Sequence, residues 1–253
     1  MTRAKRAPVE AMAAAHEAPG PAAFVEHAVR DSLERARVHF ARAEYEQAQR
    51  LCRGVLSMSP EHAEALHLLG MAYDASGAPA SAEPLLARSL QIDRRHAWAF
   101  ANHAGVLVKL GRHAEALDVL RDALLADARY PAAHLCRGHA LLALERHDEA
   151  LQAYDQALSI NPLLPEAWTN RGIVLRALGR PADALISLDR AFALAPHDYR
   201  TLVSRAHAQR DIGRREDALR SYRLALVVKP GVRELVALCE AVQREIDRMA
   251  PST

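Results

Sequence analysis

Histidine is the residue type that most suggests chemistry in this chain, because 13 of the 253 residues are histidines and imidazole is a common metal ligand. His139 and His207 lie 68 residues apart, twice a 34-residue interval that recurs along the chain. They therefore belong to separate structural units, too far apart to share one ion. No GxxxxGKS/T phosphate loop, serine elbow or HExxH zinc motif is present. We expect no metal, no cofactor and no enzymatic activity.

The cysteines and the composition describe a folded protein of a reducing compartment. Cys52, Cys136 and Cys239 are odd in number and far apart, which excludes a disulfide framework and a CxxC metal knuckle and favours a cytoplasmic location. The chain is 50% hydrophobic with a formal net charge of +2, so its total charge gives no reason to expect nucleic acid or membrane binding. Only 5% of the residues are aromatic, which predicts thin, helix-stacked units filled by Leu, Ala and Val.

Three arginines recur at equal intervals. Arg137, Arg171 and Arg205 are each 34 residues apart, and such a row of guanidinium groups could bind carboxylates of a partner. Asp155 and Asp189 stand at the same interval and offer an internal alternative, in which the arginines form ion pairs within the fold. We favour the internal pairing.

The 34-residue interval organises most of the chain. One column of positions is always alanine: Ala48, Ala82, Ala116, Ala150, Ala184 and Ala218. A second column holds only the two smallest residues: Ala36, Gly70, Ala104, Gly138, Gly172 and Ala206. A third contains Gly77, Gly111, Gly179 and Gly213, with Glu145 as the exception, and Pro60, Pro162, Pro196 and Pro230 form a fourth. Chance does not produce this regularity, so the chain consists of structural repeats.

Each repeat is expected to be a helical hairpin. Residues 166–178 carry Trp168, Gly172 and other nonpolar residues three or four positions apart, as on one face of a helix. Gly179 suits a left-handed helix end, and Pro181 suits the first turn of a second helix. Small residues at Gly172 and Ala184 would let the two helices approach closely.

This pattern resembles the tetratricopeptide repeat, a 34-residue helix-turn-helix unit. The family's series of a large apolar residue, a small residue, an aromatic or Leu, an Ala and a final Pro reads here as Trp168, Gly172, Leu175, Ala184 and Pro196. The resemblance implies an all-α fold, an α-solenoid that forms a right-handed superhelix with the first helices on its concave side. The expected repeats are residues 29–62, 63–96, 97–130, 131–164, 165–198 and 199–232. They leave no independent domain for catalysis.

The segments outside the repeats are expected to be an arm and a cap. Residues 1–22 read as a mobile arm rich in Ala and Pro and not as a signal peptide. Residues 233–250 are amphipathic and would cover the last repeat, because a repeat array exposes an apolar face at each end. No run of 18 apolar residues exists, so we expect no membrane insertion.

The charges are distributed unevenly along the array. Residues 165–232 contain 12 Lys and Arg against 7 Asp and Glu, whereas residues 63–164 contain 9 against 12. The candidate groove residues of the basic part are Arg176, Arg200 and Arg210, with His207 beside them. They would favour an acidic ligand, unless the arginines only promote helix formation and solubility. No aromatic residues alternate with them to stack bases, which argues against nucleic acid.

The other candidate groove residues are aromatic or amide side chains, together with His139. Trp98 could anchor a ligand, or it could pack between repeats. Asn102 and Asn170 resemble rungs of the asparagine ladder with which the repeat arm of O-GlcNAc transferase holds an extended peptide, although the other rungs are missing. Repeated amides suit backbone recognition because each can donate and accept a hydrogen bond. The alternative is ordinary polarity of a helix surface.

These observations predict a non-enzymatic scaffold or adaptor that binds an extended peptide or a partner helix in a concave groove. The resemblance to O-GlcNAc transferase suggests an alternative, in which the chain recognises substrates for a glycosyltransferase whose catalytic part is on another chain. Self-association through an imperfectly capped end is a third possibility.

Overall fold

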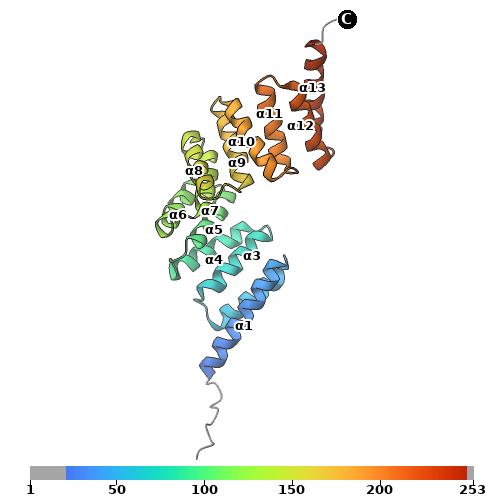
Figure 1. The fold of residues 1–253 in the computed structure, drawn as a ribbon. Coiled ribbons are helices and arrows are strands. Elements are labelled where there is room, and N and C mark those ends of the chain that lie inside the picture. The colour runs from blue at the N-terminus through green and yellow to red at the C-terminus, as the bar shows by residue number, and fades with distance from the viewer. Residues whose placement is uncertain (1–20, 250–253) are drawn as a thin grey trace, which may run out of the picture.

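The computed structural model describes residues 21–249 as a curved array of helices, and this part of the chain contains no strand (Figure 1). The expected all-α solenoid is confirmed. The helices are α1 (Pro21–Ala41), α2 (Tyr45–Met58), α3 (Ala63–Ala75), α4 (Pro79–Ile92), α5 (Ala97–Lys109), α6 (His113–Ala126), α7 (Pro131–Ala143), α8 (His147–Ile160), α9 (Pro165–Ala177), α10 (Pro181–Leu194), α11 (Tyr199–Asp211), α12 (Arg215–Val228) and α13 (Arg233–Met249). Almost all of the predicted arm, residues 1–22, lies outside the described residues.

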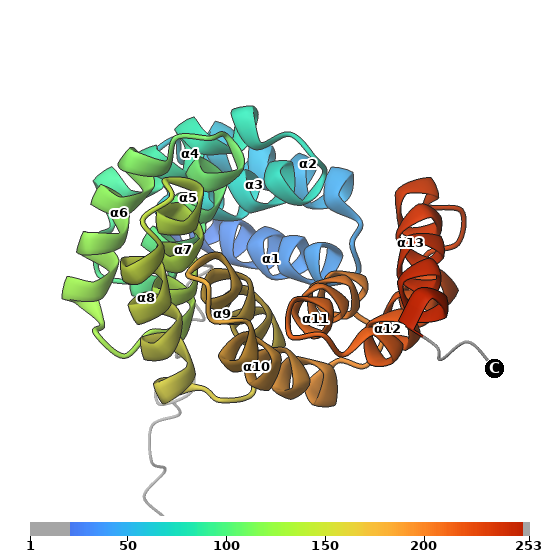
Figure 2. The same ribbon diagram turned by 90° about the horizontal axis from the view of Figure 1, so that it is seen from above.

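The first helix of each pair lies on the inner side of the curve. Each of the first helices, α1, α3, α5, α7, α9 and α11, contacts the next one in the series. Among the described residues, the second helices α2, α4, α6, α8, α10 and α12 make no such contacts with one another. An array whose units touch on one side and spread apart on the other must curve towards the touching side. Figure 2 shows this arrangement from above, with α4, α6, α8 and α10 on the outside.

The column of small residues marks the closest approach of the two helices within a pair. A Cβ atom at Gly172 would lie 2.6 Å from Cγ of Leu188 and 3.1 Å from the carbonyl oxygen of Ala184. One at Gly70 would lie 2.8 Å from Cγ of Leu86. No such Cβ fits without a shift of its neighbours, so the repeat needs a small residue here because the facing Leu fills the space.

The turn between the two helices of a pair needs a left-handed residue. Gly77, Gly111, Gly179 and Gly213 all have positive φ. Glu145, the exception in the glycine column, has the same conformation, with φ of 58°. The amide of Arg146 donates to the carbonyl of Leu141 at 2.9 Å, as the equivalent amides do in the glycine-containing turns. The hydrogen bonds of the turn therefore impose this conformation on whichever residue stands there.

Helix α13 covers the last pair. Leu235 and Val242 are buried against α12, and Leu238, Cys239 and Ile246 are partly buried beside them. Met249, the last residue of the helix, is 67% exposed. Within residues 21–249, no helix combines the length and apolar character that crossing a membrane requires.

Candidate binding sites on the inner face

Two equivalent pockets open between consecutive first helices, three repeats apart. The first lies between α3 and α5 and the second between α9 and α11, and each has a volume of about 260 Å³. Glu64 in the first pocket and Glu166 in the second hold the same repeat position. Trp98 and Arg200 also correspond, one in each pocket. The repeat thus presents one shape twice, with an aromatic ring in one copy and a guanidinium group in the other.

Trp98 both packs between repeats and remains accessible. Its ring meets the ring of His67 edge to face, with the centroids 4.5 Å apart, and stacks on His96 at 5.5 Å. The residue is nevertheless 40% exposed. The two interpretations of the sequence are therefore compatible, because neighbouring rings hold the indole in place while part of it faces solvent.

His67 and Asn102 form a hydrogen-bonded pair across two repeats. The amide nitrogen of Asn102 donates to Nε2 of His67 at 3.1 Å. Burial and, to a smaller extent, the nearby His103 together lower the pKa of His67 to about 4. The ring is therefore neutral near pH 7, which is the state that accepts this bond at Nε2.

Asn170 holds the same repeat position as Asn102 but contacts a histidine at a different position, His139, and this corrects its expected role. Its amide nitrogen donates to Nε2 of His139 at 2.8 Å, and its side chain is completely buried. No surface of Asn170 is left for a ligand, so its prediction as a peptide-binding rung is wrong. His139 is itself partly exposed, with a carboxylate oxygen of Glu166 at 3.4 Å. Burial lowers the pKa of His139, as does the charge of Arg200.

The basic part of the inner face is partly neutralised. Nε of Arg176 lies 2.5 Å from a carboxylate oxygen of Asp211, so this expected ligand contact already has a partner. His207 shares a hydrogen bond of 2.8 Å with the hydroxyl of Tyr222. Its pKa is lowered by burial and by the charges of Arg176 and Arg210. Among residues 21–249, Arg200 and Arg210 form no ion pair, although Glu166 and Asp198 line the same pocket as Arg200.

Ion pairs between neighbouring first helices were not anticipated from the sequence. Lys109 and Asp74 approach to 2.7 Å, and Arg176 and Asp211 hold the same two repeat positions with the charges exchanged. Both pairs are 35 residues apart. Opposite charges at that interval were the signal that could have revealed them. Glu64 in the first pocket is likewise paired with Arg37.

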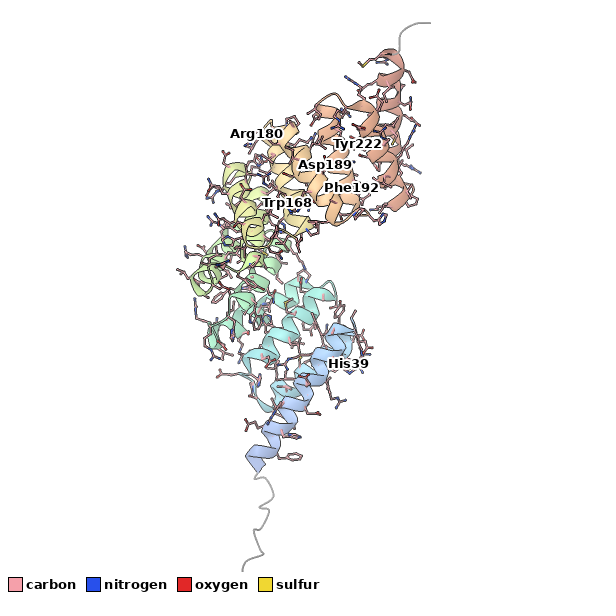
Figure 3. The ribbon with its side chains drawn as sticks, in the orientation of Figure 1. His39, Trp168, Arg180, Asp189, Phe192 and Tyr222 are labelled. Carbon is pink, nitrogen blue, oxygen red and sulfur yellow. The ribbon has the colours of Figure 1, made fainter. Side chains whose placement is uncertain are left out.

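The row of arginines is internal for two of its three members. Nε of Arg171 lies 2.6 Å from Asp155, and Nε of Arg205 lies 2.6 Å from Asp189, which confirms the pairing that we favoured. Arg205 also lies over the ring of Phe192 at 4.9 Å, and Figure 3 labels Asp189 and Phe192 on α10. Arg137 has no carboxylate partner within the described part of the chain.

Within residues 21–249, no three His, Cys, Asp or Glu side chains form a group that could hold a metal ion. Cys52, Cys136 and Cys239 are free thiols. Burial raises the pKa of Cys52 and that of Cys136 to about 11, which keeps both protonated and unreactive near pH 7.

Comparison with protein families identifies the repeats. A model described as "TPR repeat" matches residues 138–179. Two models described as "Tetratricopeptide repeat" match residues 39–103 and 75–140, and residues 165–198. Together the matches run from residue 39 to residue 198. No curated protein matches the sequence.

Solved structures show the same fold at low sequence identity. PilF of Pseudomonas aeruginosa has a TM-score of 0.75 and 20% identity, over 88% of this chain and 99% of that one. PilW, described as a widely conserved type IV pilus biogenesis factor, has a TM-score of 0.75 and 19% identity, over 83% and 97%. A chain of the APC/C hetero-tetramer Cut9-Hcn1 has a TM-score of 0.76 and 14% identity, over 87% of this chain and 45% of that one.

Proposed function

The chain belongs to the tetratricopeptide repeat family, and we propose that it is a non-enzymatic scaffold that binds an extended peptide or a partner helix along its inner face. The observation that carries this proposal is the pair of equivalent pockets, one between α3 and α5 and one between α9 and α11. Two pockets three repeats apart on one face suit a ligand that is itself extended, because groups far apart along the ligand can enter both pockets.

The two pockets favour different parts of such a ligand. The exposed part of Trp98 offers an apolar, rigid surface for a nonpolar side chain. Arg200, in the other pocket, and Arg210, further along α11, have no carboxylate partner of their own among the described residues. We therefore propose a ligand whose end near α11 is acidic; the carboxylates of Glu166 and Asp198, which line the same pocket as Arg200, limit this preference. Arg176 contributes less, because Asp211 already balances its charge.

The inner face is well organised before a ligand arrives. His67 is held by Asn102 and by Trp98, and His139 is held by Asn170. Such contacts reduce the conformational entropy that the scaffold loses on binding. They also leave the asparagines engaged with histidines. The glycosyltransferase alternative depended on those asparagines as peptide contacts, and the geometry does not favour it.

The comparisons support the general role at the level of the fold. One matched chain comes from a hetero-tetramer, so a helical array of this shape holds other chains there. For this chain we propose a protein or peptide partner, with no role for nucleic acid, and a cytoplasmic location, which the three free thiols support. The partner itself is to be identified by experiment.

Affinity capture with matched variants tests the proposal. The full chain would be immobilised and its captured partners identified and quantified by mass spectrometry. We expect the double variant Trp98→Ala, Arg200→Ala to retain less than about a tenth of the partner, since each change removes an exposed contact of the inner face. A second copy of the chain would be recognised in the same experiment.

The control is a double variant of similar chemistry on the outer side. Ile186 is 68% exposed on α10, and Arg190 lies exposed on the same helix. Ile186→Ala, Arg190→Ala should capture as much partner as the wild type. Equal capture by all three proteins would refute binding at the inner face.

A further inference from the structure

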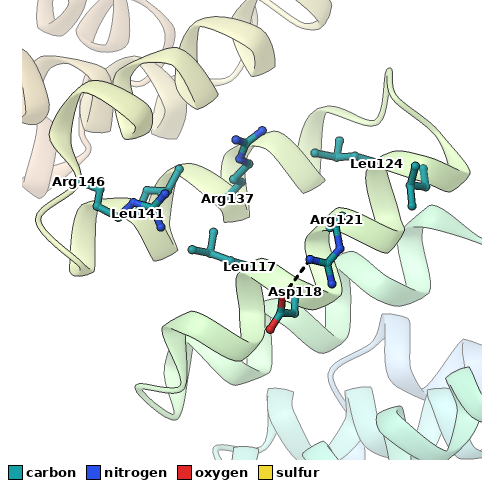
Figure 4. A pocket seen from close by; sticks show the side chains of 8 residues that line it. Leu117, Asp118, Arg121, Leu124, Arg137, Leu141 and Arg146 are labelled. Atoms are coloured by element: carbon teal, nitrogen blue, oxygen red, sulfur yellow. Dashed lines mark ion pairs between the residues drawn. The ribbon is translucent and has the colours of Figure 1, made fainter.

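A third pocket lies on the outer side of the array. One of its arginines, Arg137, has different surroundings from Arg171 and Arg205, which hold the same position in the next two repeats. The cavity has a volume of about 450 Å³ and lies between α6 and the α7–α8 hairpin (Figure 4). Three arginines line it, Arg121, Arg137 and Arg146, together with Leu124, Leu125 and other leucines. No residue of the two inner pockets belongs to it.

In the two later repeats, the arginine equivalent to Arg137 already has hydrogen-bond partners within the protein. Arg171 donates to a carboxylate oxygen of Asp155 at 2.6 Å and to the hydroxyl of Ser187 at 2.7 Å. Arg205 donates to Asp189 at 2.6 Å and to Ser221 at 3.0 Å. In both repeats a carboxylate from the preceding repeat and a hydroxyl from the same repeat fill the space beside the guanidinium group.

Both partners are missing at Arg137. The residue 34 positions before Asp155 is Arg121, and the residue 34 positions before Ser187 is Ala153. Arg137 is exposed and makes no hydrogen bond or ion pair with any described residue. The carboxylate of the later repeats is thus replaced by a second positive charge, and the hydroxyl by a methyl group.

The remaining charges of the pocket leave it positive. Arg121 lies 3.2 Å from Asp118, drawn as a dashed line in Figure 4, and both side chains are 68% exposed, so solvent weakens this pair. Arg146 is bound by Glu149 through two hydrogen bonds of 2.7 Å. The lining residues contain three arginines and one aspartate. The uncompensated charge is therefore centred on Arg137.

The apolar part of the pocket is equally unusual. Leu125 is 80% exposed beside the arginines. An aliphatic group placed against Leu125 and Leu124 would remove apolar surface from water, which is worth roughly 25 cal/mol per Å². A guanidinium group without a partner next to exposed leucines suits a ligand that carries a carboxylate and an aliphatic chain together.

We propose that this outer pocket is a second binding site, which takes a peptide carboxylate flanked by an aliphatic side chain. The ligand carboxylate replaces the one that Asp155 and Asp189 supply in the later repeats. Arg137 holds it by paired hydrogen bonds, Arg121 adds charge, and the leucines hold the aliphatic neighbour. The site lies apart from the inner pockets, so a partner can be held there whether or not the inner face is occupied.

The test uses blocked peptides and the full chain. Acetyl-Leu-Asp-Leu-amide would be titrated while the leucine methyl signals of the protein are followed by NMR, with acetyl-Leu-Asn-Leu-amide as the uncharged control. We expect the shifts to centre on Leu124 and Leu125 and the Asp peptide to bind at least about tenfold more tightly than the Asn peptide. Acetyl-Leu-Leu with a free carboxyl terminus tests whether a C-terminal carboxylate serves as well as a side chain.

Three variants decide the assignment. Arg137→Gln should weaken binding of the better carboxylate peptide about tenfold, whereas Arg171→Gln, which alters the saturated arginine, should leave it unchanged. Arg121→Asp with Ala153→Ser restores both missing partners, so it should abolish binding and raise the Tm. Three outcomes would overturn the proposal. The first is that the Asp and Asn peptides bind equally and the free acid does not bind. The second is that Arg137→Gln binds as well as the wild type, and the third is that inorganic phosphate binds as tightly as the peptides.

Discussion

Gly138 and Tyr154 illustrate how single residues set the distance between two helices. A Cβ atom at position 138 would lie 2.7 Å from Cδ1 of Tyr154, whose ring is completely buried. The equivalent facing residue in other repeats is often Leu, as at Leu86 and Leu188. The Tyr154 ring is larger than a Leu side chain and leaves less room, so no residue other than glycine fits at position 138 without displacing the ring.

Gly138→Ala should therefore destabilise the protein by about 1–3 kcal/mol, because the added methyl group displaces a buried ring. Gly105→Ala is the control: nothing lies within 4 Å of a Cβ there, and Ala should stabilise the helix by about 0.5–1 kcal/mol. Urea unfolding measures both. If both variants changed the free energy of unfolding in the same direction, packing would not distinguish the two positions.

The buried His67 makes stability depend on pH. Its pKa is about 4 in the fold because burial disfavours the charged ring, against an unfolded value of about 6.5. Between these values the unfolded chain binds the proton and the folded chain does not. Stability is thus complete above pH 6.5 and falls as the pH drops towards 4, by roughly 3 kcal/mol in total. Burial also lowers the pKa of His103, His139 and His207, which adds to this loss.

His67→Gln should flatten this dependence, because Gln can still hydrogen bond but takes up no proton in this range. Free energies of unfolding at pH 7 and pH 5 give the difference. His197→Gln is the control, since His197 is exposed in a turn and should leave the slope unchanged. A slope in His67→Gln that equals the wild-type slope would contradict the assigned burial of this ring.

At the scale of elements, the inter-helix turns show what the repeat pattern could predict. The glycine column indicated a left-handed residue between the helices, and the structure places positive φ there in every pair, including Ala43 and Glu145. The hydrogen bonds that impose this conformation are local and recur in every repeat, so the repeat pattern could predict it. The ion pair of Lys109 with Asp74 joins charges 35 residues apart, which only a search for opposite charges at that interval would have revealed. The contact of Asn170 with His139 depends on how neighbouring repeats are rotated, which the 34-residue columns do not specify.

The turn at Glu145 can be improved. A side chain with φ of 58° is strained, whereas Gly adopts this conformation freely. Glu145→Gly should stabilise the protein by about 1 kcal/mol. The reverse change at an equivalent turn, Gly179→Glu, should destabilise it by a similar amount. Thermal unfolding of the two variants is the measurement, and a lower Tm for Glu145→Gly would contradict the strain.

At the scale of the whole molecule, an array of repeats has no central core, and each end must be covered separately. The cluster under α13 contains Leu202, Tyr222, Leu235 and Val242, all buried. The repeats at the other end make no contact with it among the described residues. The stability of such a chain is a sum of local and nearest-neighbour contributions. Damage to the cap should remain local.

Val242→Asp places a charge in that cluster and should release α13. Hydrogen exchange should then show lost amide protection in α12 and α13 and little change in α3 to α6. Val236→Asp, on the exposed face of the same helix, is the control and should leave protection unchanged. Loss of protection throughout the array after Val242→Asp would mean that the protein unfolds as one cooperative unit.

Hydrogen exchange of the full chain with and without its captured partner tests the central claim, binding along the inner face, most directly. The two inner pockets lie at the N-terminal turns of α3, α5, α9 and α11, where the first amides have no acceptor within the helix, although those of Ala65 and Thr201 are capped by side chains. We predict that the partner protects these amides, including those around Trp98 and Arg200. Protection confined to the second helices, with these turns unchanged, would contradict the account.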